Sequence, residues 1–318
     1  MKQIDAANAK LREVPIELVE RNPENPRLVF RPQELETLQE SISRYGIQVP
    51  ISVYKKRGRY ILIDGERRWR CCLKLNKKTI LALVQEEPDA LTNLLLMFNI
   101  HALREEWDLL TIAFKLPRTI HLLEERLGKK ASEAQISAET GLSRSVIRRG
   151  KLLMELPEKY RTDLLDELHK PKSQQKLTED FFIEMERALK TVERSMPKAV
   201  GDKNGVRDVL IEKYKKGVIK DITDFRYLPR IAKASKVQAD VVAAADSISR
   251  VFKSNSYSIE QAYIETVSEA YSEKDIIARI DQLLQRLEEV DPGDLDEGVI
   301  KAIKHLASRL NEILRKAR

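Results

Sequence analysis

The first hundred residues alternate between short apolar runs and stretches with helical spacing. Four short runs rich in β-branched residues predict strands at residues 14–16, 51–54, 60–63 and 80–84. Leu35, Leu38 and Ile42 step by three and four residues, which predicts a helix over residues 31–45, and Gly46 is a suitable terminator. We therefore expect a small α+β domain at the start of the chain.

Beyond this domain the apolar pattern is helical. Residues 108–196 keep helical spacing, whereas residues 197–207 contain turn-forming residues and few large apolar groups. The expected organisation is an α+β domain at residues 1–107, an all-helical domain at 108–196, a linker at 197–207 and a helical C-terminal domain at 208–318. The protein as a whole is expected to be mainly α-helical.

Two apolar stripes stand out near the C-terminus. Each has five members that step by four and three: Ile276, Ile280, Leu283, Leu287 and Val290, then Val299, Ile303, Leu306, Leu310 and Ile313. The segment 291–294 separates them with a proline and a glycine. Stripes of this kind need a covering surface, either each other in an αα-hairpin or a second subunit. We expect a homodimer.

Composition narrows the class of protein. Charged residues make up 34% of the 318 residues and aromatic residues 6%, which favours a helix-rich chain over a β-sandwich. The net charge of +7 is compatible with a polyanionic partner. Cys71 and Cys72 are the two cysteines, and we interpret them as small apolar residues of a buried helix. The sequence lacks a membrane-spanning apolar run and a signal-peptide pattern, so we expect a cytoplasmic protein.

Residues 132–154 have the pattern of a helix-turn-helix. Ser132 is placed to cap a helix that runs to Thr140, Gly141 supplies a tight turn, and Ser143 is placed to cap the next helix. In this arrangement the second helix enters the major groove of duplex DNA. The residues expected to meet phosphates or base edges are Ser143, Arg144, Ser145, Arg148, Arg149 and Lys151. Gly150 lies within that helix and allows either close approach to DNA or close packing.

The stretch Gly65-Glu66-Arg67-Arg68-Trp69-Arg70 follows a predicted strand and begins a predicted helix. A glycine at such a turn lets backbone approach a ligand closely. Three arginines then surround a helix N-terminus, where free N–H groups already favour anions. A solvated basic helix start is the alternative interpretation.

Together with other motifs, this stretch resembles the ParB family of chromosome- and plasmid-partition proteins. The chain contains Asn22-Pro23-Glu24-Asn25-Pro26-Arg27, then Gly46-Ile47-Gln48-Val49-Pro50-Ile51, then the Gly65–Arg70 stretch, all in the family's order. The family's third motif corresponds to Phe98-Asn99-Ile100-His101 with Arg104-Glu105 beyond, and Ser132–Pro157 is similar to the family's helix-turn-helix. The resemblance covers roughly residues 13–195.

The resemblance implies a sulfiredoxin-like N-terminal fold that binds CTP with Mg²⁺, closing a dimer into a clamp on double-stranded DNA. The residues that it assigns to the nucleotide are Gly46, Ile47, Gln48, Pro50, Ile51, Gly65, Glu66, Arg67, Arg68 and Asn99. Asn99 and Glu66 are the expected Mg²⁺ ligands. Backbone donors, arginine forks and a divalent cation are suitable partners for a triphosphate.

The chain also departs from the family pattern. Phe98 replaces the third-motif glutamate that the family links to hydrolysis, so we expect at most weak CTP hydrolysis. Val49 replaces a glutamine in the first phosphate motif, although Gln48 stands one position earlier. Met1–Lys10 lacks the basic, glycine-rich peptide with which many members stimulate a ParA-type ATPase, so that partner, which the resemblance implies, is in doubt.

Two other functions stay open at the level of sequence. The protein could be a transcriptional regulator that uses the helix-turn-helix without nucleotide gating. The N-terminal fold also supports enzymes, namely a nucleotide-dependent kinase or a nuclease. A kinase needs a carboxylate base, for which Glu66 is the obvious candidate, and the sequence offers no compact His, Asp and Glu cluster for a nuclease.

Overall fold

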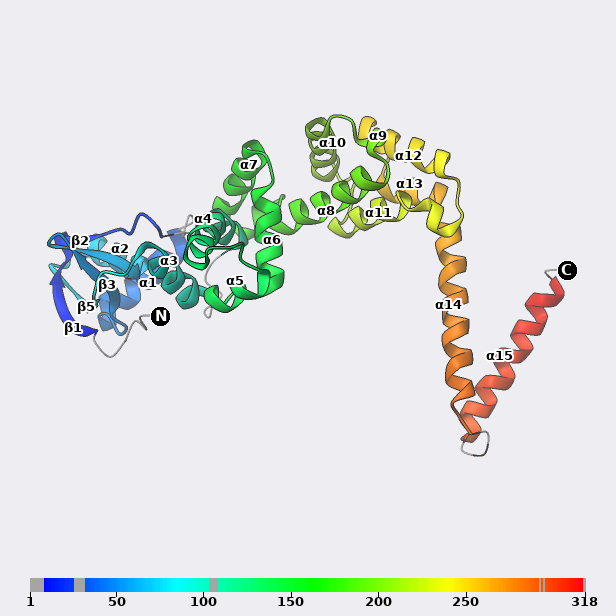
Figure 1. Cartoon of the computed structure of the whole chain (residues 1–318), viewed down its shortest axis with the longest axis horizontal. Helices are drawn as coiled ribbons and strands as arrows, with labels where there is room; N and C mark the ends of the chain where they lie inside the picture. The colour runs from blue at the N-terminus through cyan, green and yellow to red at the C-terminus, as the bar shows by residue number, and fades with distance from the viewer. Residues whose placement is uncertain (1–8, 26–31, 103–107, 292, 294, 317–318) are drawn as a thin grey trace. The chain divides into compact units, whose positions relative to one another are not determined.

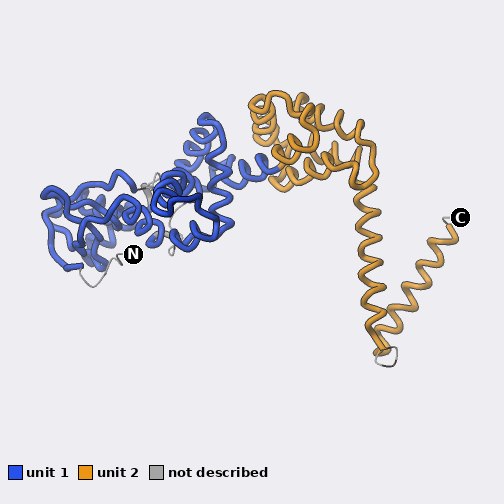
Figure 2. Tube along the Cα trace, in the orientation of Figure 1, with its two compact units in different colours: residues 1–187 blue, residues 188–318 orange. Residues whose placement is uncertain are grey.

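The computed structural model describes residues 9–25, 32–102, 108–291, 293 and 295–316. The chain divides into two compact units, residues 1–187 and residues 188–318, where we predicted three domains (Figure 2). The first unit contains both the N-terminal α+β fold and the helix-turn-helix. The second unit is helical. The predicted boundary at residue 107 falls inside the first unit, outside the described residues.

A five-stranded sheet forms the N-terminal part of the first unit (Figure 1). Its strands are β1 (Lys10–Pro15), β2 (Val19–Glu20), β3 (Ile51–Lys56), β4 (Arg59–Asp64) and β5 (Thr79–Gln85), in the order β1-β5-β3-β4-β2. β3 pairs antiparallel with β4 through a tight turn in which Arg57 and Gly58 both have positive φ, as a two-residue hairpin requires. β3 pairs parallel with β5, and β1 pairs antiparallel with β5. The predicted strands at 51–54, 60–63 and 80–84 are confirmed, the one predicted at 14–16 overlaps only the end of β1 because Ile16 begins a 3-10 turn, and β2 was not predicted.

Helices α1 (Pro32–Tyr45), α2 (Glu66–Lys74) and α3 (Ala90–Ala102) accompany the sheet. The core contains apolar side chains from α1, α2 and the strands, among them Leu35, Ile42, Ile51 and Val53. Cys71 and Cys72 are free and buried in this core, as expected, and burial raises the pKa of both thiols. They therefore act as small apolar residues.

The remaining helices of the first unit are α4 (Leu109–Leu127), α5 (Glu133–Thr140), α6 (Arg144–Met154), α7 (Glu158–His169) and most of α8 (Glu179–Ser195), with a 3-10 turn at Lys172–Gln174. A single apolar core joins α3 to α4, α5 and α6 and includes Leu95, Phe98, Leu116, Ile136 and Ile147. Through α3, the sheet domain and the helix-turn-helix therefore belong to one packed body.

The second unit begins within α8 and continues through α9 (Pro197–Val200), α10 (Lys203–Lys215), α11 (Tyr227–Ile231), α12 (Val241–Lys253) and α13 (Ile259–Thr266). Short 3-10 segments lie at Ile222–Arg226 and Ala234–Val237. The prediction of a linker at residues 197–207 is wrong, because these residues form α9 and the first turns of α10. Val200, Val206 and Arg207 are buried there, and Asp202 caps α10. The turn-forming residues in this stretch lie at the ends of helices and do not form an extended segment.

The last two helices are α14 (Ser268–Glu288) and α15 (Glu297–Lys316). Neither helix contains a buried residue among those the structure describes. Figure 1 shows them diverging from their common turn, so the αα-hairpin interpretation of the two stripes is not what the structure has. No helix in the described part of the chain is long and apolar enough to cross a membrane.

Candidate functional site

Gly65 forms the turn between β4 and α2, and only glycine fits there. Its φ of 94° is in the left-handed region that side chains disfavour. A β-carbon added at this position would lie 2.6 Å from Cγ2 of Ile51, so the turn also presses against β3. This close approach brings the Gly46–Ile51 segment and the Gly65–Arg70 stretch together, as the sequence predicted for one binding region.

The side chain of Arg68 connects these two segments through hydrogen bonds and an ion pair. Its guanidinium donates to the carbonyl oxygens of Val49 (2.6 Å) and Pro50 (2.8 Å) and pairs with the carboxylate of Asp64 at 2.9 Å. Its side chain is only 15% exposed. In this conformation the guanidinium is occupied by the protein itself. An anion that recruits Arg68 must therefore displace Asp64 or the two carbonyls.

Glu66 is buried among cationic and amide groups. Its carboxylate pairs with Arg70 at 2.7 Å and Arg21 at 3.3 Å, and it accepts a hydrogen bond from the side chain of Asn25. Arg67 turns toward α1, where it meets the carboxylate of Glu34 at 3.6 Å. The structure thus brings the predicted arginines to the start of α2 but pairs each of them within the protein.

The first phosphate motif follows α1 as a loop. Gly46 has positive φ and its N–H bonds the carbonyl of Ile42, which ends α1 as predicted. Ile47 packs against the sheet core, and Gln48 is exposed with its amide on the carbonyl of Tyr45. Ile51 is fully buried in β3. Gly46, Gln48 and Val49 of this motif therefore remain accessible to a ligand, whereas Ile51 does not.

Asn99 lies in α3 and contacts the helix-turn-helix. Its side-chain amide donates to the carbonyls of Leu95 (2.9 Å) and Glu139 (3.0 Å), and Glu139 is in the last turn of α5. A β-carbon on Gly141 would lie 2.9 Å from Oδ1 of Asn99. The third motif thus bridges the sheet domain and the turn of the helix-turn-helix, a contact that the sequence did not reveal.

The neighbouring Phe98 has no exposed surface and belongs to the core shared by α3, α4, α5 and α6. The residue that replaces the family's glutamate is therefore a packing residue. It cannot orient a water molecule for hydrolysis. His101, Arg104 and Glu105 of the third motif, like Pro26 and Arg27 of the Asn22–Arg27 segment, have side chains outside the described residues.

The two predicted Mg²⁺ ligands share no partner. Glu66 is surrounded by two arginines, an environment that already neutralises its charge, and Asn99 donates to backbone carbonyls of α3 and α5. Within the described part of the chain, no three His, Cys, Asp or Glu side chains gather as metal ligands. The residues present in this conformation do not fit an ion, and Mg²⁺ binding stays a prediction.

The helix-turn-helix has the predicted local structure. Ser132 and Gln135 form a reciprocal capping box on α5, and Ser143 accepts a hydrogen bond from the N–H of Val146 at the start of α6. Gly141 ends α5 with a φ of 74°. Gly150 faces α4, since a β-carbon there would lie 3.4 Å from Leu116. Close helix packing is therefore the reason for this glycine.

The exposed side of α6 is basic, and its cations differ in their partners. Arg148 pairs with Glu133 of α5 at 2.8 Å, and Arg149 pairs with Asp180 of α8. Among the described residues, no carboxylate lies within ion-pair distance of Arg144, which is exposed beside Ser145. Lys151 lines a hollow of about 380 Å³ between α4 and α6. The nearby cations also lower the pKa of Glu133, chiefly through the hydrogen bond from Arg148.

Sequence analysis missed the acidic partners of these cations. Asp64 stands four residues before Arg68, a helical ion-pair spacing that was readable in principle. Glu24 pairs with Lys115 at 3.2 Å and with Arg118 at 3.0 Å. These ion pairs connect the Asn22–Arg27 segment to α4. Pairs of this second kind join distant segments and leave no local pattern in the sequence.

Comparisons with known proteins agree with the motif analysis. Residues 1–100 match the family model described as the ParB N-terminal domain. The chain is 31% identical over 182 residues to the chromosome-partitioning protein ParB of Caulobacter vibrioides (strain NA1000 / CB15N), covering 51% of this chain and 55% of that protein. The chain spans about half the length of the curated relatives it matches.

Two crystal structures of the C-terminally truncated chromosome-partitioning protein ParB from Caulobacter crescentus are also similar. The complex with the centromeric parS site is 25% identical, covers 70% of this chain and 98% of that chain, and has a TM-score of 0.43. The complex with CTP-gamma-S is 28% identical, covers 54% and 92%, and has a TM-score of 0.29. Residues 1–100 therefore belong to the ParB N-terminal domain family, and the chain is similar in sequence, over about half its length, to chromosome-partitioning proteins named ParB.

Proposed function

We propose that the protein binds double-stranded DNA through α6 and acts in DNA partition. The observation that carries this proposal is the basic, exposed side of a correctly capped second helix, with Arg144 free of any internal carboxylate among the described residues. Guanidinium groups there meet phosphates, and Ser143 and Ser145 lie at the helix start, where base edges are read. Lys151 extends the same basic stripe by one turn.

The finer part of the proposal is that CTP gates this binding from the sheet domain. The nucleotide would lie beside Gly65, where backbone approaches closely and the N-terminus of α2 favours phosphate. Its triphosphate would take over Arg68 from Asp64 and Arg67 from Glu34. Glu66 and Asn99, the predicted Mg²⁺ ligands, would first have to leave their present partners before they could hold an ion that neutralises phosphate charge.

Coupling between the two elements follows from contacts that cross between them. Asn99 bonds the last turn of α5, and Glu24 bonds Lys115 and Arg118 of α4. Asn99 belongs to the residues assigned to the nucleotide, and Glu24 lies in the Asn22–Arg27 segment, whose Asn25 bonds Glu66 of the nucleotide region. A nucleotide that moves either motif must therefore alter the support of the DNA-reading helices. This is the physical basis on which we propose gating.

The last two helices indicate that a second copy of the chain is a partner. The apolar stripes of α14 and α15 are exposed, with Ile280 at 43% and Leu310 at 41%. Exposed stripes this long are unfavourable in water, and pairing with the same stripes of another chain removes them. We propose a homodimer formed through α14 and α15. A ParA-type ATPase is not part of this proposal.

One observation favours a second candidate function, a helix-turn-helix regulator without nucleotide gating. Arg67, Arg68 and Arg70 are all satisfied by groups of the protein itself. Ion pairs that are already formed oppose recruitment by a triphosphate. If they persist, the α2 region serves only to hold the sheet domain together, and CTP leaves DNA binding unchanged.

Fluorescence anisotropy with the full-length protein separates these candidates. Labelled duplexes carrying either a parS site or a scrambled sequence are titrated over a range of salt, with and without CTP, ATP, GTP or UTP. DNA affinity that falls steeply with salt and changes only with CTP supports the proposal. Equal affinity in all nucleotides, together with no heat of CTP binding by calorimetry, leaves the ungated regulator. No duplex binding at low salt rejects both.

A further inference from the structure

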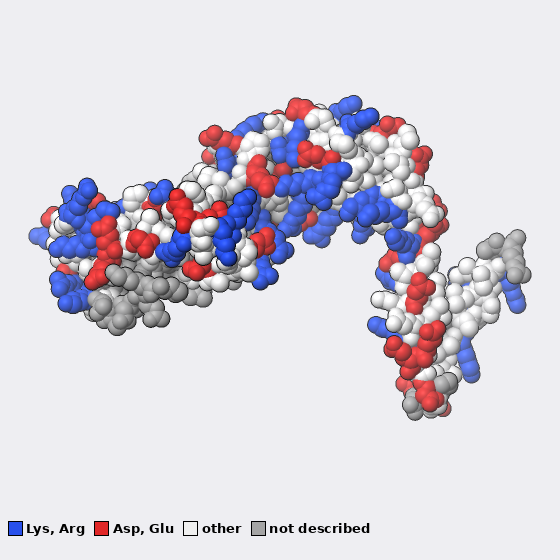
Figure 3. Space-filling model, viewed as in Figure 1, with Lys and Arg blue, Asp and Glu red and all other residues white. Residues whose placement is uncertain are grey.

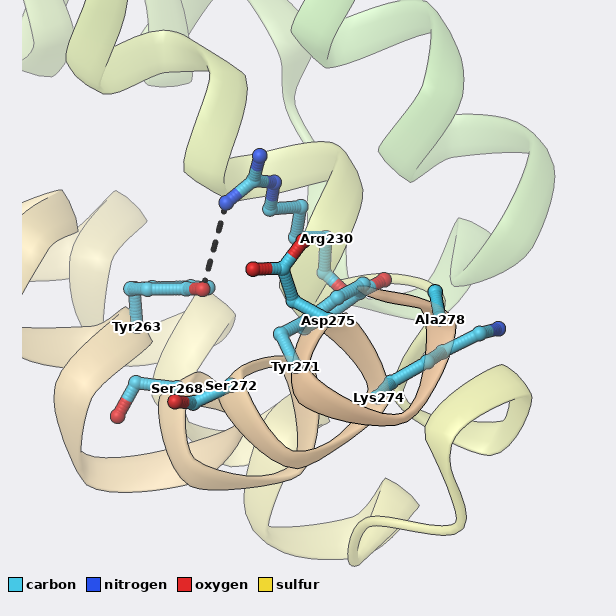
Figure 4. Close-up of a pocket in the computed structure, with 8 residues that line it drawn as sticks. All are labelled: Arg230, Tyr263, Ser268, Tyr271, Ser272, Lys274, Asp275 and Ala278. Atoms are coloured by element: carbon cyan, nitrogen blue, oxygen red, sulfur yellow. Dashed lines mark hydrogen bonds between the residues drawn. The ribbon is translucent and has the colours of Figure 1, made fainter. Parts of the chain in front are cut away.

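The second unit contains an open hollow of about 620 Å³ that none of the motifs explains (Figure 4). Arg230 of α11, Tyr263 of α13 and Tyr271 of α14 form its most distinctive side. Ser268, Ser272 and Lys274 of the first turns of α14 contribute further polar groups. Three separate helices therefore converge on one concave surface that combines aromatic rings, cations and hydroxyls.

The aromatic rings in this hollow are held in place from behind. Tyr263 lines the hollow and stacks on Tyr227 with centroids 4.4 Å apart, so one face of the Tyr263 ring is supported by a second ring. Its hydroxyl meets the guanidinium of Arg230 at 3.3 Å, as Figure 4 shows. Tyr271 donates its hydroxyl to the carbonyl of Arg230 at 3.3 Å. The rings therefore lose little conformational freedom when a ligand binds.

Arg230 closes the gap between the two rings. The centroids of Tyr263 and Tyr271 are 6.3 Å apart with a tilt of 34°, and the guanidinium carbon lies 5.8 Å from the first and 5.6 Å from the second. Among the described residues, no carboxylate lies within ion-pair distance of Arg230, whose side chain is exposed. Several of its N–H donors thus remain available for an anion next to two aromatic faces.

The surroundings of the hollow are basic. Residues 225–239 contain Arg226, Arg230, Lys233 and Lys236 and no Asp or Glu. Figure 3 shows Lys and Arg side chains gathered over the part of this unit that contains α11. Asp275 is the acidic member of the lining, and its charge is offset by Arg279 at 2.8 Å. A negatively charged strand can therefore follow this surface across the aromatic rings.

We propose that this hollow binds single-stranded nucleic acid, with an unpaired base against Tyr271 and Tyr263 and the adjoining phosphate on Arg230. Aromatic platforms beside a basic track are the arrangement that proteins use for unpaired strands. A duplex presents phosphates but keeps its base faces inside the stack, so it would leave the rings unused. An acidic peptide would use Arg230 but has no regular series of flat rings.

The test uses full-length protein and fluorescein-labelled oligo-dT, followed by anisotropy. Tyr271→Ala should weaken strand binding about tenfold, whereas Tyr271→Phe, which keeps the ring, should change it by less than about twofold. Arg230→Ala should weaken binding by a similar factor and reduce the salt dependence by about one phosphate contact. Because Arg230 is exposed, its variant keeps the test decisive if Tyr271→Ala fails to fold in circular-dichroism melts.

Matched controls separate this site from the rest of the protein. Tyr45→Ala removes an exposed tyrosine of the first unit and should leave strand binding unchanged. Arg144→Ala should weaken duplex binding and spare oligo-dT binding. Wild-type affinity for oligo-dT in Arg230→Ala and in folded Tyr271→Ala would overturn the proposal. Displacement of oligo-dT by an equal concentration of poly-glutamate-tyrosine peptide would overturn it in favour of an acidic peptide.

Discussion

Helices α4 and α14 are alike in sequence pattern but differ in their surroundings. α4 spans 19 residues and α14 spans 21, and both carry apolar residues at helical spacing. α4 buries Leu110, Leu116 and Leu123 against neighbouring helices of the first unit. α14 buries none of its described residues. An amphipathic pattern thus predicts that a face will be covered, but it does not say whether the same chain provides the cover.

Charged side chains show the opposite contrast. In the first unit the arginines at the start of α2 are paired with carboxylates of the same unit. In the second unit Arg230 stands beside aromatic rings without a carboxylate partner among the described residues. The arginines of α2 therefore have their partners within the first unit, whereas α14, α15 and Arg230 of the second unit present apolar and cationic groups to another molecule.

The largest effect is expected from charging the exposed stripes. Leu283→Asp combined with Leu310→Asp should weaken dimerisation by at least about 100-fold, because each buried carboxylate in an apolar interface costs several kcal/mol. Sedimentation equilibrium over a concentration series measures the change. Gln285→Asp on the opposite side of α14 adds the same charge outside the stripe and should leave the dimer intact. A double variant that stays dimeric would show that α14 and α15 are not the interface.

The next largest effect tests the packing of the first unit at Gly65. Gly65→Ala should lower the free energy of unfolding by about 2–4 kcal/mol, because it combines backbone strain with a collision against Ile51. Gly58→Ala is a matched control, since its φ is also positive but nothing lies within 4 Å of its added carbon. Urea denaturation compares the two. Equal losses would mean that the close contact between the two motifs is unimportant.

Much of this architecture was predictable because its signals are local. The strand segments, the turn at Gly58, the end of α1 at Gly46 and the caps at Ser132 and Ser143 all depend on a few neighbouring residues, and the structure has them. The sheet order was not predictable, because pairing of β1 with β5 depends on contacts between segments about 70 residues apart.

The candidate site shows the same division. The sequence placed Arg68 and Gly65 together at the start of α2. It did not reveal that Arg68 donates hydrogen bonds to the carbonyl oxygens of Val49 and Pro50. It marked Phe98 as a departure from the family, but only packing shows that this ring joins α3 to the helix-turn-helix core. The exposed stripes were found and the need for a partner was expected. The surface that covers these stripes could not be predicted, because it belongs to another molecule and leaves no local pattern in this sequence.

Within α6, Arg144, unpaired among the described residues, and the paired Arg148 are expected to contribute differently to DNA binding. Arg144→Ala should weaken duplex binding about tenfold, because a phosphate contact is lost with no internal bond regained. Arg148→Ala should cost less, since Arg148 must first leave Glu133 to reach DNA. Glu133→Gln should strengthen binding by freeing that guanidinium and removing a negative charge. Anisotropy at several salt concentrations measures all three, and the reverse order for the two arginines would contradict the structure.

The smallest effect concerns two titratable groups whose pKa values are shifted by burial, one in each unit. Burial raises the pKa of Glu179 in the first unit to about 7, against its usual 4.5. Its nearest charged groups are Asp108, Asp180 and Arg149, and it accepts the N–H of Leu110 at 2.6 Å. Burial lowers the pKa of Lys213 in the second unit from 10.5 to about 8, where its ammonium donates to the carbonyls of Val251 and Tyr257.

These shifts give the two units opposite responses to pH. Glu179 binds its proton more tightly when folded, so the first unit should lose stability, of order 1 kcal/mol, as pH rises from about 5 to 7. Lys213 releases its proton more readily when folded, so the second unit should gain stability between about pH 8 and pH 10. Trp69 and Trp107 both lie in the first unit, so tryptophan fluorescence reports on that unit alone.

Fluorescence-monitored urea unfolding at several pH values therefore isolates Glu179. Glu179→Gln keeps an oxygen that can accept from Leu110 but cannot ionise, so it should flatten the dependence between pH 5 and pH 7. Glu184→Gln, on the same helix, is the control and should preserve the slope of the wild type. If wild type and Glu179→Gln have the same slope, the carboxyl is not held in its protonated form. The first unit would then lack the buried acid that distinguishes its pH response from that of the second.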